Sequence, residues 1–410
     1  MAFFNKTNAD IGNTLWGRFQ VGLLFMIMLL QPFKSLHGFY DGLLIISLVI
    51  IGISIYTKQF KLPSKTFLIL LGIYIFSILI STFISVDIKE SLDGIRSELL
   101  KQLIVFSIIL VPMASAVQKR NGVLWGFMLS GVIMNTIGLF PYFFGYLASK
   151  DNRLVSFSES YTRLAYFYVY LVPFLVLLIP REKKWETTSV YILLILSLLA
   201  TLLTKTRGGW ICVPLAAFIA CLITLRWKEL LSLILIILIG GVLIFSVSPS
   251  LRSRASDFQE VKDWSGSFGL RKGTWQSATN TIKKRPIFGA GYGKYIFRKV
   301  YELNPVEGSE PYCDTHNTYL EILTQRGVFG FLITLALYLY FLKITFFVSQ
   351  THSEWGSALF AYFIAISVAF AIFSLVDNIY VKETGRYLWQ MAALSMVFFN
   401  DAASKENCKK

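Results

Sequence analysis

Long, nearly uncharged apolar stretches recur along most of this 410-residue chain, and they limit its possible folds more than any other feature. Each stretch runs for about 16 to 22 residues, which lets an α-helix cross a hydrocarbon core of about 30 Å. Apolar residues make up 55% of the chain and charged residues only 15%, whereas soluble proteins carry about 25% charged residues. The sequence therefore predicts an all-α integral membrane protein.

The apolar stretches predict about 12 transmembrane helices, with one large extramembrane loop between the later ones. They are expected at residues 17–33, 39–56, 67–85, 102–117, 123–147, 161–179, 188–204, 210–225, 229–247, 327–349, 355–375 and 386–399. The chain then divides into three parts: transmembrane helices 1–9 within residues 1–247, a large loop with helices at 248–326, and helices 10–12 with a tail at 327–410.

Basic residues set the expected orientation. The net charge is +15, but the lysines and arginines form short clusters between apolar stretches rather than one nucleic-acid-binding patch. Short loops that face the cytoplasm carry an excess of Lys and Arg. Applied to this chain, the rule places both termini in the cytoplasm and the large loop on the outer side of the membrane, with membrane lipids as neighbours and no nucleic acid as partner.

Arg207 lies in a tight turn between two expected transmembrane helices, at the outer boundary of the membrane. Gly208 and Gly209 follow it, and they let the chain turn sharply and expose backbone N–H groups beside the guanidinium. This arrangement favours an anion site. An arginine at this depth can also extend to lipid head groups without any further role. The sequence leaves both interpretations open.

Residues 268–285 of the large loop have the pattern of an amphipathic helix. One face carries Arg271, Trp275, Ala278 and Ile282. Pro286 is expected to end the helix. The glycines at 289–293 then favour a tight turn over a phosphate-binding loop, because no strand–loop–helix context surrounds them.

His316 is the candidate general base. It lies where the large loop returns to the membrane, among the polar residues Asp314, Asn317 and Glu321. Imidazole is the side chain whose ordinary pKa best suits proton transfer near neutral pH. The alternative is an interfacial helix start, capped by Asp314 or Thr315.

Arg153 and Asp377 are two further candidates, the first in an outer loop and the second at the outer end of an expected transmembrane helix. Ionisable residues at such depth usually have a function and a partner. Lys382 or Arg386 could instead neutralise Asp377 in a structural ion pair.

Several familiar motifs are missing. The chain has no D-x-D, H-E-x-x-H, C-x-x-C or Walker motif, so neither metal-dependent nor ATP-driven chemistry is expected, and no cofactor or nucleotide is predicted. Arginines bind phosphate bidentately, and a histidine can accept a proton from a hydroxyl group. A lipid-linked diphosphate is a substrate that needs this combination.

Three motifs occur in a defined order along the chain. They are T-R-G-G-W at 206–210, G-L-R-K-G-T-W…R-P-I-F-G-A-G-Y-G at 269–293 and H-N-T-Y-L-E-I-L-T-Q-R-G-V-F-G at 316–330. On these motifs the chain resembles the O-antigen ligase / O-antigen polymerase superfamily of bacterial envelope glycosyltransferases. The resemblance implies a GT-C-type fold in the bacterial inner membrane. It also implies metal-independent transfer of glycan from undecaprenyl diphosphate to an acceptor at the periplasmic face.

Carried onto this sequence, the resemblance implies that Arg207 and Arg271 bind the diphosphate and that His316 activates the acceptor hydroxyl. Arg153 matches the family's basic residue in D-N-R-L, although the small-residue and Asn-Pro pattern that often follows is absent, and Asp377 matches an acidic position. The expected activity is that of an O-antigen ligase, which transfers O-antigen to lipid A–core with inversion. The alternatives are an O-antigen polymerase, a protein O-oligosaccharyltransferase, and a lipid-linked-glycan flippase or transporter.

Overall fold

The computed structural model describes residues 15–57, 63–113, 118–149, 151–178, 184–256, 266–306, 313–351, 356–379 and 382–407. Over these residues the chain is helical, and its one β pairing is an isolated bridge between Ala148 and Leu154. Some of the basic residues that set the expected orientation, such as Lys58 and Arg181, lie outside the described residues. The prediction of an all-α protein is confirmed for the described part.

The helices differ in length and in role. The longer ones form the bundle: α1 (Leu15–Leu30), α2 (His37–Tyr56), α3 (Lys65–Phe83), α5 (Leu100–Met113), α6 (Gln118–Thr136), α7 (Tyr161–Leu178), α8 (Lys184–Leu203), α9 (Arg207–Ile223), α10 (Trp227–Val247), α15 (Thr318–Thr351), α16 (Gly356–Phe373) and α17 (Lys382–Asn407). The others are α4 (Ile88–Gly94), α11 (Pro249–Ser256), α13 (Gly266–Lys284), α14 (Ile296–Leu303) and the short turns η2 (Lys34–Leu36), η3 (Ile95–Leu99), η4 (Phe140–Phe144) and η5 (Ser156–Ser158).

Every stretch expected to span the membrane coincides with one of the bundle helices. Among the described residues, 7 helical segments are long and apolar enough to cross a membrane, and α1 and α9 are shorter apolar helices. The seven segments are Lys34–Tyr56, Lys65–Phe83, Gly122–Phe144, Tyr161–Leu178, Trp185–Leu203, Thr318–Gln350 and Gly356–Phe373. The protein is thus a multi-pass helical membrane protein, and the larger count of 12 stays a prediction.

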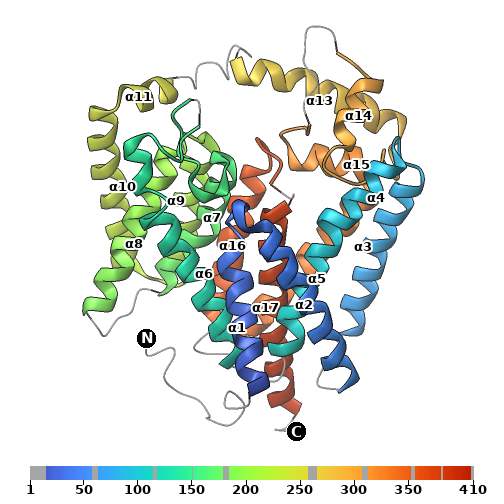
Figure 1. Ribbon diagram of the computed structural model, residues 1–410, viewed down its shortest axis with the longest axis horizontal. Coiled ribbons are helices and arrows are strands. Elements are labelled where there is room, and N and C mark those ends of the chain that lie inside the picture. The colour runs from blue at the N-terminus through green and yellow to red at the C-terminus, as the bar shows by residue number, and fades with distance from the viewer. Residues whose placement is uncertain are drawn as a thin grey trace.

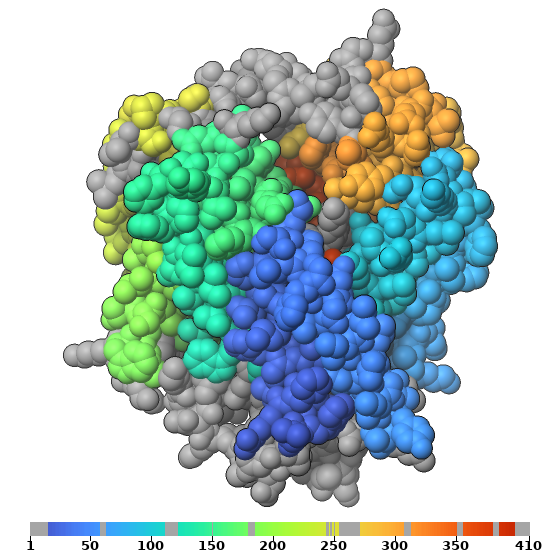
Figure 2. All heavy atoms as spheres, viewed as in Figure 1, coloured from blue at the N-terminus to red at the C-terminus, as the bar shows by residue number. Residues whose placement is uncertain are grey.

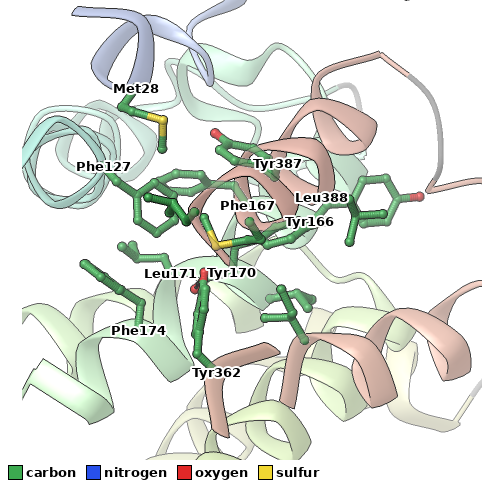
Figure 3. Packing of buried hydrophobic residues seen from close by; sticks show 14 of the residues in the cluster. Met28, Phe127, Tyr166, Phe167, Tyr170, Leu171, Phe174, Tyr362, Tyr387 and Leu388 are labelled. Carbon is green, nitrogen blue, oxygen red and sulfur yellow. Dashed lines mark hydrogen bonds between the residues drawn. The ribbon is translucent and has the colours of Figure 1, made fainter. Parts of the chain in front are cut away.

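Helix α7 lies at the centre of the bundle. All of its residues from Leu164 to Leu177 are buried, and α6, α8, α9, α16 and α17 pack against it. Figure 3 shows its aromatic side chains among those of neighbouring helices; the labelled rings are Phe127, Tyr166, Phe167, Tyr170, Phe174, Tyr362 and Tyr387. Interlocked rings of this kind have few alternative arrangements, so α7 provides a rigid support for whatever lies at its ends.

The large loop has a small hydrophobic core of its own. Helices α13 and α14 bury Ala278, Phe297 and Val300 there, together with Ala290 from the segment between them. Helix α13 covers nearly the range expected for the amphipathic helix. In Figure 1, α13 and α14 lie across one end of the bundle, whereas the start of α1 and the end of α17 lie at the opposite end.

Helix α15 breaks at Gly327, whose φ of 63° and ψ of −168° are not helical. A break leaves N–H groups after it and C=O groups before it without intrahelical partners. The segment 286–291 supplies partners for four of these groups. The hydrogen bonds are Val328 N–H to Pro286 O (2.8 Å), Phe329 N–H to Ile287 O (3.1 Å), Ala290 N–H to Thr324 O (2.8 Å) and Gly291 N–H to Gln325 O (3.1 Å).

The expected tight turn at the glycines is confirmed by this contact. Gly289, Gly291 and Gly293 all have positive φ, of 72°, 130° and 133°. A Cβ on Gly289 would overlap the backbone of Gln325. The turn therefore needs glycine for both its conformation and its close approach to α15.

Gly327→Ala should lower the free energy of unfolding by roughly 1–3 kcal/mol, because alanine is strained at positive φ and its Cβ would overlap the carbonyl oxygen of Ile287. Gly52→Ala in α2 is the matched control, since a Cβ there meets nothing within 4 Å and alanine favours a helix. Thermal and denaturant unfolding in detergent compare the two. Equal stability of both variants would mean that the break does not need glycine.

Candidate active site

His316 is held in an unusual backbone conformation by its neighbours. Its φ is 49°, in the left-handed region, and its N–H donates to Oδ1 of Asp314 at 2.9 Å. The preceding residue, Thr315, is fixed on both sides. Its N–H donates to Oε2 of Glu321 at 2.9 Å, and its carbonyl accepts from Nε1 of Trp275 on α13 at 2.9 Å. Such strain persists only where the surroundings over-determine the conformation, which is common at functional sites.

The two residues after His316 attach the start of α15 to the turn that follows α16. Asn317 Nδ2 donates to the carbonyl of Leu375 at 3.1 Å. Thr318 N–H donates to the carbonyl of Ser374 at 2.8 Å, and its hydroxyl donates to the carbonyl of Asp377 at 3.0 Å. Three consecutive residues of the H-N-T sequence therefore face the same turn, and this turn carries Asp377.

His316 and Asp377 form a pair. Nδ1 of His316 lies 3.2 Å from Oδ1 of Asp377 and 3.5 Å from Oδ1 of Asp314. The Asp377 side chain is 14% exposed and that of His316 28%. With the Nδ1 proton donated to the carboxylate, Nε2 is the ring nitrogen that can accept a proton from another group. The alternative of a simple helix cap does not explain this contact across 61 residues.

Two further groups act on the pair. The hydroxyl of Tyr166, on buried α7, hydrogen bonds to the Asp377 carboxylate. Arg271 of α13 lies close enough to act electrostatically on both His316 and Asp377, one turn before the Trp275 that anchors α13 to Thr315. The predicted residues Arg271, His316 and Asp377 are thus brought together.

These surroundings shift both pKa values. Burial lowers the pKa of His316, but its hydrogen bond to Asp377 and the negative charges of Asp314 and Asp377 outweigh burial and raise that pKa above its ordinary value. Burial raises the pKa of Asp377, but the hydrogen bonds and charge of His316, with Tyr166 and Arg271, hold that pKa below its ordinary range. Asp377 is therefore an anion at neutral pH, and it supports a proton on Nδ1 of His316.

Arg207 is the first residue of α9, and the two glycines after it explain its position. A Cβ on Gly208 would overlap the ring of Phe373 at the end of α16, and a Cβ on Gly209 would lie 3.0 Å from Cβ of Ala165 on α7. Glycine therefore lets the start of α9 reach α7 and α16. The ring of Phe373 also packs against that of Tyr166, with centroids 4.8 Å apart, so α9 begins close to where α7 meets the end of α16.

Arg153 lies apart from this group. Its guanidinium is 4.4 Å from the ring centroid of Tyr161 and 3.6 Å from the carboxylate of Asp151. Its loop is tied to the end of α8 by a 2.9 Å hydrogen bond from Leu154 N–H to the carbonyl of Leu203. In the described part of the chain, Arg153 thus contacts its own loop rather than His316 or Asp377.

The suggested ion pair between Arg386 and Asp377 is wrong. The guanidinium of Arg386 lies 5.1 Å from the ring centroid of Tyr40, because α17 turns this residue toward α2. The side chain of Lys382 lies outside the described side chains. Asp377 is instead paired with His316.

Asp314, His316 and Asp377 also form a group of possible metal ligands, since one ligand atom from each lies within 4.8 Å of the others. No metal-binding motif in the sequence indicates this group, because Asp314 and His316 precede α15 whereas Asp377 follows α16. The positive charge of Arg271 acts on the same place and disfavours a second cation there.

The sequence also missed Tyr166 and a buried network behind His316. Nε2 of Gln325 donates to Oε1 of Glu321 at 2.7 Å and to the carbonyl of Gly293 at 3.1 Å. Glu321 in turn holds Thr315. Glu321 and Gln325 are one helical turn apart, and this spacing could have predicted a hydrogen bond between them. Gly293, the other partner of Gln325, is distant in the sequence, so the rest of the network could not be predicted.

Figure 2 shows a hollow on this face of the molecule. It lies between the blue α1–α2 region, the green α6–α7 region and the orange α14–α15 region, and red residues from the C-terminal part of the chain are visible inside it. This face of the molecule is thus recessed between those three regions.

Comparison with protein families gives a match over residues 192–335, to the family described as O-Antigen ligase. The matched range contains Arg207, Arg271 and His316, whereas Arg153 and Asp377 lie outside it. The match agrees with the resemblance seen in the three motifs: residues 192–335 are similar to the O-antigen ligase family, and this supports a ligase- or polymerase-type role in O-antigen processing.

Two curated proteins are similar to this chain over most of its length. An uncharacterized protein of Haemophilus influenzae is 26% identical over 346 residues, which cover 79% of this chain and 84% of that protein. An O-antigen ligase of Salmonella typhimurium is 22% identical over 271 residues, which cover 65% of this chain and 66% of the ligase.

Asp377→Asn should lower the pKa of His316, because it removes a negative charge and the acceptor that favours the imidazolium. The chain has 3 histidines, so NMR titration of labelled histidine can follow each ring, with the other two as internal references. Asp314→Asn should shift the pKa in the same direction. An unchanged or higher pKa in Asp377→Asn would contradict the pairing.

Proposed function

We propose that this chain, whose residues 192–335 form an O-antigen ligase domain, transfers O-antigen polysaccharide from undecaprenyl diphosphate to a sugar hydroxyl of lipid A–core. The observation that carries the proposal is the His316–Asp377 pair beside Arg271. It supplies a proton acceptor and a cation at one place. The site faces the periplasm, at the end of the bundle covered by α13, in a chain of the bacterial inner membrane with both termini in the cytoplasm.

His316 is the general base. Its Nε2 takes the proton from the acceptor hydroxyl as the oxygen attacks the anomeric carbon of the first O-antigen sugar. The bond from that carbon to the diphosphate oxygen breaks, and its electron pair leaves with undecaprenyl diphosphate. Asp377 holds the Nδ1 proton, which orients the ring and stabilises the imidazolium that forms. One displacement inverts the anomeric configuration.

Arg271 and Arg207 stabilise the leaving diphosphate. Arginine binds phosphate oxygens through two parallel N–H groups, and its charge offsets the one that develops on the leaving oxygen. Arg271 lies within electrostatic reach of the base, and Arg207 begins a helix, whose N-terminus adds a partial positive charge. Arg153 lies farther out and has a supporting role at most, such as guiding the anionic donor.

The proposed reaction needs no metal ion or cofactor. The leaving group is a diphosphate that two arginines can neutralise, and the charge of Arg271 disfavours a cation between Asp314, His316 and Asp377. The GT-C-type fold implied by the motifs stays a prediction.

Reconstitution tests the activity directly. The purified chain is mixed with undecaprenyl-diphosphate-linked O-antigen and lipid A–core, without nucleotide, and the lipopolysaccharide is separated on a gel. A ladder on the core supports a ligase. Longer lipid-linked glycan with untouched core would instead indicate an O-antigen polymerase. If glycan is transferred to neither substrate, the proposal is wrong. The remaining alternatives would then be transfer to a protein acceptor and glycan transport.

His316→Ala should reduce turnover by about 10²–10⁴-fold, the usual contribution of general base catalysis, with expression and unfolding temperature unchanged. Initial rates of ladder formation measure the effect. His352→Ala, at a histidine to which neither proposal assigns a role, is the histidine control and should keep normal turnover. Turnover near that of the unmodified protein in His316→Ala would exclude this residue as the base.

Arg271→Lys should reduce turnover by about 10²-fold or more, because lysine keeps the charge but loses the bidentate contact. Lys272→Gln is the control, since its side chain is exposed on the next position of α13. Neither variant should respond to EDTA. A rate that falls in EDTA and recovers with a divalent cation would contradict metal independence.

A further inference from the structure

A second group of basic side chains surrounds a small pocket between the α1–α2 turn and the start of α7. The residues that line it include Lys34, His37, Ser158 and Arg163, over a floor formed by Phe167 and Tyr387. Its volume is about 20 Å³, room for about one water-sized atom. Three basic side chains, from η2, α2 and α7, thus line one small pocket.

One carboxylate, that of Glu159, lies against these bases. Nζ of Lys34 is 2.6 Å from its Oε2, and the two side chains are 43% and 49% exposed. The hydrogen bond from Lys34 lowers the pKa of Glu159, and the charges of Lys34, Arg163 and His37 lower that pKa further. The positive potential of all three bases therefore acts at the position of this carboxylate.

Glu159 does not hold its place firmly. Exposed ion pairs contribute little to stability, because both partners are well solvated when apart. Two cations and an imidazole also exceed the charge of one carboxylate. A group with more negative charge and more acceptor oxygens than a carboxylate can therefore displace Glu159 from Lys34.

The pocket lies beside the candidate active site. Arg163 precedes Tyr166 by three residues on α7, a rise of about 4.5 Å along the helix, and Tyr166 hydrogen bonds to Asp377. In Figure 2 the blue α1–α2 region forms part of the rim of the hollow.

We propose that Lys34, His37 and Arg163 form a second anion subsite, which holds a phosphate group of the acceptor lipid. The proposal rests on the proposed function, in which Arg207 and Arg271 hold the donor diphosphate. The acceptor must present its hydroxyl to His316, and a phosphate on the rim, one turn of α7 away, would orient it. Glu159 occupies the subsite when no acceptor is bound.

This role assigns opposite effects to the two members of one ion pair. Lys34→Gln removes a phosphate contact and should weaken acceptor binding about tenfold. Glu159→Gln removes the competing anion and should tighten it several-fold. A purely structural ion pair predicts effects in the same direction, because either change breaks the pair. Lys299→Gln is the matched control, since Lys299 is 45% exposed and lies 3.2 Å from Glu302.

Binding is measured without turnover. The full-length protein with His316→Ala is reconstituted in phosphatidylcholine vesicles, and the dissociation constant of fluorescent lipid A–core is determined for each added substitution. Lipid A–core with its phosphates removed is the second probe. It should bind more weakly, and equally to the Lys34, Glu159 and Lys299 variants. Arg163→Gln should behave as Lys34→Gln does.

Three results would overturn the subsite. They are equal binding by all variants, parallel changes in Lys34→Gln and Glu159→Gln, and the same changes with the dephosphorylated probe. If the variants instead differ only when phosphatidylglycerol is added to the vesicles, the pocket holds a phospholipid head group and the acceptor assignment is wrong. The binding assay does not require glycan transfer, so the two proposals can fail separately. If binding depends on the lipid phosphates but the unmodified protein transfers no glycan, the proposed function is wrong and the subsite is still supported.

Discussion

The break in α15 at Gly327 is the constraint on which the site depends. It leaves polar backbone groups inside a helical bundle, where an unpaired group is costly. The segment 286–291 pairs with four of them, and so the large loop is drawn onto the bundle. Once it is docked there, α13 follows and places Trp275 on Thr315 and Arg271 beside His316. The need to pair the backbone groups at the break in α15 therefore determines where the guanidinium of Arg271 lies, at the end of the bundle.

The candidate site is assembled from four elements, each held by a different interaction. His316 comes from the start of α15, Asp377 from the turn after α16, Tyr166 from α7 and Arg271 from α13. The H-N-T sequence joins the first two through main-chain hydrogen bonds, and the burial of α7 fixes the third. Because the groups are partly buried, their charges act on one another more strongly than in water.

Two arginines are buried in the bundle. Arg326 is 1% exposed and lies 5.0 Å from the ring centroid of Tyr74, and Arg386 lies over Tyr40. Aromatic faces stabilise such cations without a carboxylate. Asp314, His316 and Asp377, which can exchange protons with one another, lie instead where the large loop meets the bundle, which suits surface chemistry better than a proton path through the bundle.

The sequence by itself determined the helical class, the positions of the long helices, the amphipathic α13 and the glycine turn, because hydropathy and helical periodicity are local properties of the chain. Motif order also made Arg207, Arg271 and His316 candidates. Only the tertiary structure decided that Asp377 pairs with His316 rather than with Arg386, that Tyr166 joins them, and that Arg153 stays in its own loop. It also brought Lys34, His37 and Arg163 around Glu159. The His316–Asp377 contact joins residues 61 positions apart and the Lys34–Glu159 contact residues 125 positions apart; such pairs depend on how helices pack, which no local pattern encodes.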